Sequence, residues 1–146
     1  MQSALEDFAR TIETSYDQLL KIAEAETDTP LAPGKWSRKE VIGHLIDSAA
    51  NNHHRFVKAQ FTDDLLISRY AQQPWVKCQD YRSRAWAELL LFWKSYNLHL
   101  LHVASRIPAE RLEALCRFED GESVSLRFLV TDYVVHLKHH LKQILG

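Results

Sequence analysis

The chain has 146 residues, of which 46% are hydrophobic and 25% are charged, and its formal net charge at pH 7 is −1. This length and composition suit one soluble globular domain, which we expect to span residues 1–146. The near-neutral charge gives no electrostatic footprint for nucleic acid or a membrane surface, and the longest apolar run is too short to cross a bilayer.

The cysteine content and the N-terminus indicate a cellular compartment. Two cysteines, Cys78 and Cys116, are too few for a disulfide framework and are not spaced as a C-x-x-C pair. The acidic, amphipathic N-terminal sequence MQSALEDFAR does not resemble a signal peptide. We therefore expect a cytoplasmic protein with reduced thiols.

A loop separates the first two predicted helices. Residues 3–26 carry apolar side chains at three- and four-residue spacing, which predicts an amphipathic helix. The following sequence, TDTPLAPGKW, contains two prolines and a glycine and predicts a loop. Ser37 and Glu40 then form an S-x-x-E capping box, which predicts a second helix with Ser37 as its N-cap and its end near Gln60.

Two more helices are predicted in the second half of the chain. Residues 61–80 have mixed periodicity, and we expect a long connection with room for a short helical turn. A third helix is predicted over residues 81–106, before Pro108. The sequence EDGE then predicts a turn between two short extended pieces, and a fourth helix with Ser125 as its N-cap is expected over residues 126–145. Four long helices predict an all-α four-helix bundle.

The fourth predicted helix carries His136, His139 and His140 in the sequence DYVVHLKHHLKQILG. Histidines four residues apart project from the same helix face, so His136 and His140 can bind one metal ion. His139 lies about 100° from His140 around the axis and does not point to the same place. An H-x-x-x-H pair alone is a weak signal. Both residues, however, lie at the border of the predicted apolar face, where a ligand is held by packing and still reached by water.

His44 is the leading candidate for a third ligand. It lies about 10 Å along the second helix from its cap, whereas His136 and His140 lie about 7 to 14 Å from the end of the fourth. These depths coincide only if the two helices are antiparallel, which a simple up-down-up-down bundle does not provide. The long connection between the second and third helices permits an up-down-down-up topology instead, and two independent features thus agree.

A different interpretation of the second helix remains open. A polar stripe follows one side of this helix and consists of His44, Asp47, Ser48, Asn51 and Arg55. Periodicity alone favours a hydrated surface for this stripe, and Asp47 and Arg55 can equally be ordinary surface charges.

Two stretches of the chain resemble the DinB superfamily: GKWSRKEVIGHLIDSAANNHHRFVKAQ and VSLRFLVTDYVVHLKHHLKQI. The specific marks are Trp36 and Ser37, the sequence GHLID, and the closing H-x-x-x-H followed by Gln143. This resemblance implies an up-down-down-up bundle in which His44, His136 and His140 hold zinc or nickel, and it implies a homodimer. Characterised members of the family transfer low-molecular-weight thiols such as bacillithiol, mycothiol or glutathione, and others are described as metal-dependent hydrolases.

The leading hypothesis is a metal-dependent enzyme that transfers a low-molecular-weight thiol to an electrophile, because a bound ion can make a thiolate near neutral pH. Asn51 and Arg55 are expected to bind a polar group or carboxylate of the cosubstrate. Asp47 and Tyr133 are expected to line the pocket, and Tyr133 is a candidate proton donor. For each of these four side chains a pocket wall or an ordinary surface position is the simpler alternative.

Two other functions stay open. Metal-activated water would make the protein a hydrolase, and a bundle that keeps its metal without turnover would be a stress-linked binding protein. No catalytic residue is identified from the sequence. The expected partners are a small-molecule substrate and a second copy of the chain, with neither nucleic acid nor membrane.

Overall fold

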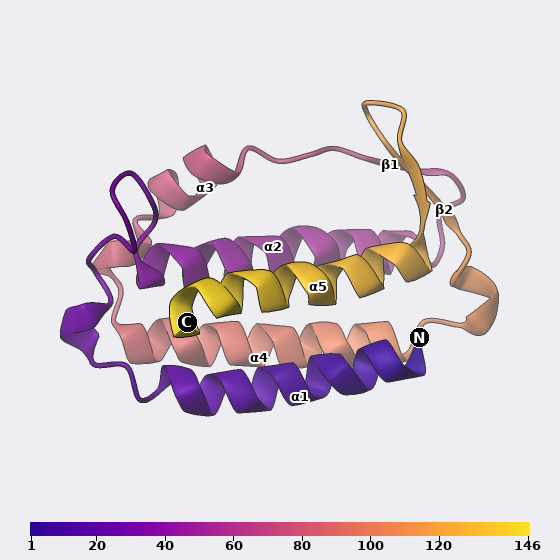
Figure 1. Ribbon diagram of the computed structural model, residues 1–146. Helices are drawn as coiled ribbons and strands as arrows, with labels where there is room; N and C mark the ends of the chain where they lie inside the picture. The colour runs from indigo at the N-terminus through magenta and orange to yellow at the C-terminus, as the bar shows by residue number, and fades with distance from the viewer.

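The computed structural model describes residues 1–146, and four long helices run along one another in it (Figure 1). These are α1 (Gln2–Leu19), α2 (Arg38–Lys58), α4 (Trp86–Ser105) and α5 (Leu126–Leu145). Helices α1 and α5 run in one direction, and α2 and α4 run in the other. The prediction of a helical bundle with up-down-down-up topology is therefore confirmed. None of the helices is long and apolar enough to span a membrane.

The connection from α2 to α4 crosses back over the length of the bundle. It contains the strand β1 (Leu65–Ile67), the helix α3 (Gln72–Gln79) and the short 3₁₀ helix η2 (Tyr81–Ser83). The predicted long crossover is present, but it contains more regular structure than a short helical turn. The third long helix begins five residues later than predicted, because Arg84 and Ala85 have extended backbone conformations that separate η2 from α4.

A small sheet stands at one end of the bundle. The strands β2 (Leu115–Phe118) and β3 (Ser123–Ser125) form an antiparallel hairpin, as the EDGE sequence predicts. Strand β1 adds a parallel edge to β2, which was not predicted because three residues show no periodicity. Arg69, which follows β1, forms ion pairs with Asp120 and Glu122 of the hairpin turn at 3.0 and 2.7 Å. The pairing of β1 with β2 and the ion pairs of Arg69 thus hold the crossover against the hairpin.

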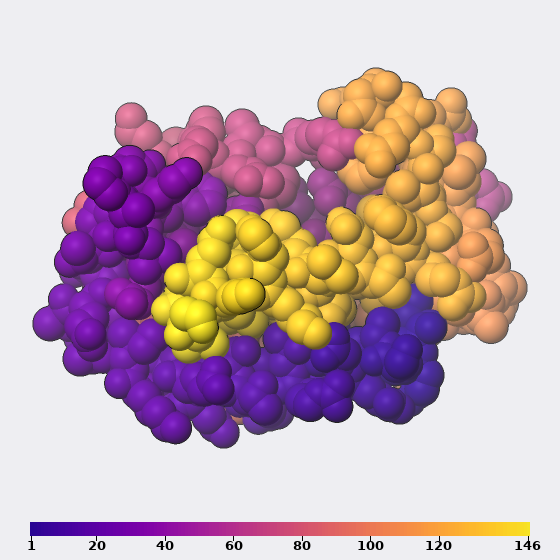
Figure 2. Space-filling view, viewed as in Figure 1, coloured from indigo at the N-terminus to yellow at the C-terminus, as the bar shows by residue number.

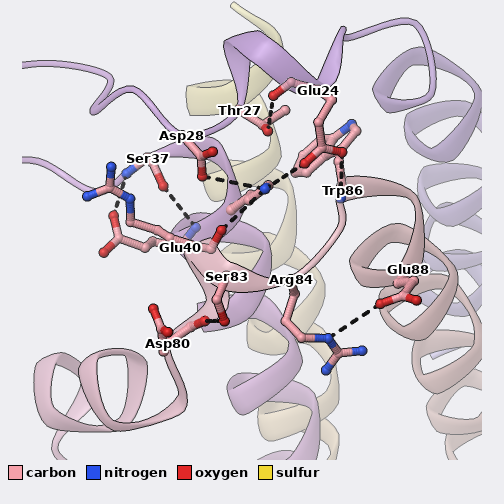
Figure 3. Close-up of polar contacts among 12 residues, drawn as sticks. Glu24, Thr27, Asp28, Ser37, Glu40, Asp80, Ser83, Arg84, Trp86 and Glu88 are labelled. Atoms are coloured by element: carbon pink, nitrogen blue, oxygen red, sulfur yellow. Dashed lines mark hydrogen bonds and ion pairs between the residues drawn. The ribbon is translucent and has the colours of Figure 1, made fainter.

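Helix α1 ends seven residues earlier than predicted. The indole N–H of Trp86 donates to the carbonyl of Leu19, the last residue of α1, at 3.1 Å. Residues Glu24–Glu26 form a separate 3₁₀ helix, η1, and the Glu24 carboxylate accepts the backbone N–H of Trp86 at 2.9 Å (Figure 3). Glu24 also pairs with the buried Lys39 at 2.6 Å. These contacts with α2 and α4 hold the segment after α1 in another conformation, so α1 does not continue into it.

The caps of the two helices that carry the candidate ligands match the sequence analysis. Ser37 Oγ accepts the N–H of Glu40, and the Glu40 carboxylate accepts the N–H of Ser37, which completes the capping box before α2 (Figure 3). Ser125 Oγ accepts the N–H of Phe128 at the start of α5. Helix α5 has the predicted bounds, 126–145. Both helices therefore begin at fixed positions, which sets the depth of their histidines in the bundle.

Gly43 is the place where the crossover packs most closely on α2. A Cβ atom at this position would lie 2.0 Å from the ring of Tyr81, which is buried in η2. Glycine in a helix normally costs about 1 kcal/mol relative to alanine. The close approach of the Tyr81 ring explains why this site nevertheless carries glycine.

We expect Gly43→Ala to destabilise the protein by about 1–3 kcal/mol, because the new methyl group would overlap the Tyr81 ring. Replacing a helical glycine by alanine usually has the opposite effect and stabilises the protein. The measurement is urea unfolding followed by circular dichroism. In a Tyr81→Ala background, where no ring opposes the new methyl group, the same substitution should stabilise. A stabilising effect of Gly43→Ala in the native background would contradict the close packing described above.

Candidate metal centre

Three histidines that are far apart in the sequence, one on α2 and two on α5, converge at one place in the bundle. His44 Nε2 lies 3.3 Å from His136 Nε2, and His136 Nε2 lies 3.1 Å from His140 Nε2. The ligand nitrogens of all three lie within 4.8 Å of one another. We refer to His44, His136 and His140 as the histidine triad. The antiparallel run of α2 and α5 brings together the three residues that the sequence analysis selected.

The triad has the geometry and chemistry of a metal site. Two imidazole nitrogens about 2.0–2.1 Å from one ion are separated by about 2.8–3.4 Å at ligand angles between octahedral and tetrahedral values. The two shortest separations here, 3.1 and 3.3 Å, fall in that range. The three Nε2 atoms have no protein partners other than one another. A shared proton satisfies one pair of nitrogens, whereas one cation satisfies all three lone pairs.

The surroundings of the triad fix the orientation of its rings. His140 Nδ1 lies 2.9 Å from Gln143 Oε1, an oxygen that only accepts, so the proton belongs on Nδ1 and Nε2 keeps its lone pair. The ring of Trp36 lies 5.0 Å from that of His44 between centroids, at 34°. His139 is exposed, and its Nε2 lies 3.2 Å from the Gln143 amide nitrogen; its ring lies 5.2 Å from that of His140, but it does not belong to the group of convergent ligand nitrogens. The expected exclusion of His139 agrees with this position.

The triad is neutral at physiological pH. Burial, followed by repulsion from His140 and His136, lowers the pKa of His44 to about 3. Burial, with repulsion from His140 and His139, lowers the pKa of His136 to about 4. Burial also lowers the pKa of His140, against the hydrogen bond that His140 donates to Gln143, which acts to raise it. Neutral imidazole is the form that binds a metal ion.

The prediction of a hydrated surface for the polar stripe on α2 is wrong for the first three residues of the stripe. His44 is 0% exposed, and Asp47 and Ser48 are also buried. The crossover covers this side of α2: Asp47 Oδ1 accepts hydrogen bonds from the Tyr81 hydroxyl at 2.6 Å and from Gln79 Nε2 at 2.7 Å. Asp47 is therefore a buried group that binds the crossover, and the alternative of an ordinary surface charge does not hold for it.

A cavity of about 400 Å³ lies beside His136. In Figure 2 this region is a hollow between the crossover, the hairpin and α5. Its wall is formed by four parts of the chain and consists of Ser48, Asn52, Arg55, Arg69, Tyr70, Gln72, Phe118, Glu122, Phe128, Leu129, Asp132, Tyr133 and His136. Of the four predicted pocket residues, Arg55 and Tyr133 line this cavity, whereas Asp47 and Asn51 do not.

The two predicted lining residues differ in what they offer a ligand. The Tyr133 hydroxyl is buried and donates to Asn97 Oδ1 at 2.6 Å, so its proton is already engaged, and burial raises its pKa. Arg55 is half-buried, and its one hydrogen bond is a 3.4 Å contact with the carbonyl of Ser68. Burial lowers its pKa, and no carboxylate lies within ion-pair distance of it. Arg55 is therefore the cation in this cavity that is free to bind an anionic ligand.

Sequence reasoning missed most of the cavity wall. Asp132 precedes His136 by four residues on α5, and this i, i+4 spacing is a signal that could have found it. Asn52 adjoins the predicted Asn51 on α2. Arg69 and Tyr70 lie in the crossover, where no periodic pattern marks them. Phe118 comes from the hairpin, and only the parallel pairing of β1 with β2 brings it to the cavity.

An up-down-down-up bundle with three converging imidazoles defines a class of helical proteins with a histidine-lined site. Residues 7–144 match the DinB superfamily over nearly the whole chain, and the protein belongs to that superfamily. A relative from Bacillus cereus strain AH820, named "Putative metal-dependent hydrolase", is 22% identical over 98% of this chain and 84% of its own length. A relative of the same name from Bacillus mycoides strain KBAB4 is 25% identical over 83% of this chain and 69% of its own length.

Solved structures show the same fold. YfiT from Bacillus subtilis, described as a probable metal-dependent hydrolase with an unusual four-helix bundle topology, matches with a TM-score of 0.87. The match has 19% identity and covers 98% of this chain and 82% of YfiT. A mycothiol-dependent maleylpyruvate isomerase matches with a TM-score of 0.80 and 14% identity, over 98% of this chain and 60% of that protein.

We predict that His44→Ala, His136→Ala and His140→Ala each weaken metal binding by at least about 100-fold, because each removes one of three ligands. His139→Ala is the matched control and should keep the metal, since its imidazole lies outside the triad. The measurement is metal content per chain of protein purified without a histidine tag, with calorimetric titration of zinc and nickel. Equal losses in all four variants, or no loss in any, would be incompatible with the triad as the metal site.

We also predict that the metal-free protein loses stability as the pH falls from about 6.5 toward 4. In this window the unfolded histidines, with ordinary pKa values, bind protons that His44 and His136 exclude in the folded state. Urea unfolding at several pH values in the presence of a chelator measures this slope. A His44→Gln, His136→Gln double variant should show a shallower slope, and an unchanged slope would contradict the lowered pKa values.

Proposed function

We propose that the histidine triad holds one divalent ion, zinc or nickel, and that the protein is an enzyme that transfers a low-molecular-weight thiol to a small electrophile. The observation that carries this proposal is the half-buried Arg55, without a carboxylate partner, in the cavity that His136 also lines. A metal ligand and a free cation in one cavity suit a ligand with a metal-binding group and a carboxylate. Common low-molecular-weight thiols such as glutathione combine these two groups. The fold shared with a mycothiol-dependent enzyme supports the same choice.

The side chains of the cavity have separate roles in this reaction. A bound divalent ion lowers the pKa of a thiol and so supplies a thiolate at neutral pH. Arg55 binds the carboxylate of the thiol and orients it. Phe118, Phe128 and Leu129 provide an apolar wall that limits the access of water to the electrophile. Asp132 is exposed at the rim without an ion-pair partner and can accept an ammonium group of the same cosubstrate.

The neutral triad suits the start of this reaction. Because their pKa values are lowered, His136 and His140 are neutral. Neither ring therefore carries the second proton, and with it the positive charge, that would repel a metal ion. The Tyr133 hydroxyl is bonded to Asn97 and is not the proton donor in this proposal. The thiol proton leaves to solvent through the open side of the cavity.

A metal-dependent hydrolase is the second candidate, and the names of the Bacillus relatives favour it. In that case the same triad serves an activated water, and Arg55 binds an anionic substrate. The two candidates differ in their products, because a transferase incorporates the thiol and a hydrolase incorporates water. A protein that binds metal and turns over neither kind of substrate would be the non-enzymatic binding protein.

The proposed setting is the cytoplasm, which supplies reduced low-molecular-weight thiols. Cys78 is exposed and Cys116 is buried, and both are free thiols in the structure. We propose that the protein acts there as a homodimer.

We predict that Arg55→Gln raises the KM for carboxylate-bearing thiols by about 10- to 100-fold, the value of a hydrogen bond to a charged group. The measurement is conjugation of glutathione or bacillithiol to monochlorobimane by the zinc- or nickel-loaded protein. Cysteamine, which has a thiol and no carboxylate, should show the same KM with the native protein and the variant.

Arg10→Gln, which changes an exposed arginine on α1, is the control and should leave every KM unchanged. An equal rise of KM for cysteamine and glutathione would contradict the role of Arg55. No conjugation of any of these thiols by the metal-loaded native protein would contradict thiol transfer itself.

A further inference from the structure

A second cavity adjoins the histidine triad. Its volume is about 480 Å³, and His140 contributes to its wall. The cavity of about 400 Å³ has His136 in its wall instead, and the two cavities share no residue. Because His136 Nε2 and His140 Nε2 lie 3.1 Å apart, both cavities adjoin the same candidate metal centre. We refer to them as the His136 cavity and the His140 cavity.

The two cavities lie on opposite sides of the triad along the bundle. On α5 the His136 cavity is lined by residues between 128 and 136, and the His140 cavity by His140 and Gln143. On α2 the residues of the His136 cavity follow His44, whereas the His140 cavity has Val41, which precedes it. Since α2 and α5 are antiparallel, both helices assign the same ends of the bundle to the two cavities (Figure 1).

A short loop and the start of α3 form one wall of the His140 cavity, at the end of the bundle where α5 ends (Figure 1). The loop covers residues 30–37, and an antiparallel bridge joins its first and last residues. The Leu31 N–H donates to the carbonyl of Trp36 at 3.1 Å, and Gly34 turns the chain with a φ of 72°. A groove of about 980 Å³ between this loop and α3 shares Trp36 and Gln73 with the cavity and is its entrance.

The His140 cavity carries charge of one sign. Lys35 is its one charged side chain, and no carboxylate lines its wall. Lys35 is exposed, and none of the ion pairs in the structure involves it. The wall of the His136 cavity, by contrast, contains both arginines and carboxylates. An anionic ligand in the His140 cavity therefore meets a free cation and no opposing carboxylate.

An aromatic ring and two aliphatic side chains give the His140 cavity an apolar surface. Trp36 is half-buried, and its ring centroid lies 5.0 Å from that of His44. Leu31 and the buried Val41 extend this surface. A flat ring can stack on the indole, and the Gln73 amide offers a donor and an acceptor at its edge. Shape and charge together suit an aromatic compound with an anionic substituent.

We propose that the His140 cavity binds the second substrate, an aromatic electrophile with a carboxylate. The ring of this compound stacks on Trp36, and its carboxylate pairs with Lys35. The thiol occupies the His136 cavity, so the two substrates reach the triad from its two sides. This inference rests on the proposed function, because only a transferase needs both a thiol and an electrophile.

The two cavities suit a displacement at an aromatic carbon. With an aryl chloride, the thiolate sulfur forms a bond to the ring carbon, and the carbon–chlorine bond breaks. Chloride leaves with the electron pair of that bond, and the thiol proton has passed to solvent. No oxidant or reductant is consumed. The product then has its thiol part in the His136 cavity and its aromatic part in the His140 cavity.

The first test measures binding without turnover, with the full chain supplied with zinc and no thiol. Dinitrobenzoate, which has no leaving group, should bind and quench the tryptophan fluorescence. Lys35→Gln should raise its Kd by about 3- to 10-fold, the value of a solvent-exposed ion pair. Lys142→Gln is the matched control, since Lys142 is exposed on α5 outside this cavity, and its Kd should equal that of the native protein.

Arg55→Gln distinguishes the two cavities in the same measurement. This variant should bind dinitrobenzoate as tightly as the native protein, because Arg55 lines the His136 cavity. Weaker binding by Arg55→Gln, or equal effects of Lys35→Gln and Lys142→Gln, would overturn the assigned location. Absence of binding at millimolar dinitrobenzoate would overturn the proposal as well.

The second test compares two aryl chlorides in conjugation with glutathione by the zinc-loaded protein. Chlorodinitrobenzoate, with its chlorine para to the carboxylate, has the anionic group that chlorodinitrobenzene lacks. Lys35→Gln should raise the KM for chlorodinitrobenzoate by about 3- to 10-fold and leave that for chlorodinitrobenzene unchanged. An unchanged KM for chlorodinitrobenzoate, or an equal rise for both compounds, would contradict the role of Lys35.

The two tests separate this inference from the proposed function. If the protein conjugates neither aryl chloride but still binds dinitrobenzoate through Lys35, thiol transfer is wrong and the His140 cavity keeps its aromatic, anionic ligand. If conjugation proceeds and no step depends on Lys35, thiol transfer stands and the assigned electrophile site is wrong.

Discussion

The antiparallel contact between α2 and α5 is the constraint on which the rest of the structure depends. It brings the early part of α2 beside the late part of α5, and so it brings His44 to His136 and His140. The same contact makes α2 and α4 parallel, because both are antiparallel to α5. A chain that leaves the end of α2 must then return about 30 Å to the start of α4. The long crossover therefore goes together with the convergence of the three histidines.

The return path of the crossover determines what α2 buries. Since the chain passes over the outer side of α2, the polar residues on that side lose their water and need other partners. Asp47 finds them in Tyr81 and Gln79, and Gly43 leaves room for the Tyr81 ring. The cost of burying this carboxylate appears as a raised pKa. The crossover also supplies Arg69, Tyr70 and Gln72 to the cavity, so one segment closes the fold and completes the candidate site.

Local signals predicted much of the fold and of the triad. The bounds of α5 and the N-caps of α2 and α5 were found because Ser37 and Ser125 act on backbone groups three residues away. The triad was found because helical spacing and depth are regular along an axis. The end of α1 was missed because distant residues, Lys39 and Trp86, hold the segment that follows it. The burial of His44 was missed for the same kind of reason, since the element that covers it has no periodicity of its own.

Packing and one hydrogen bond hold the three rings of the triad in place. Three imidazole rings are held with centroids 4.5–5.2 Å apart, with Trp36 beside one ring and Gln143 bonded to another. Buried His44 Nδ1 and Asp47 Oδ2 have no hydrogen-bond partner in the protein, and the convergent Nε2 lone pairs lack enough protons to satisfy them all. Such an arrangement lowers the stability of the metal-free protein. The rings would need little reorganisation to bind the proposed cation, which would satisfy the Nε2 lone pairs and so couple metal affinity to folding.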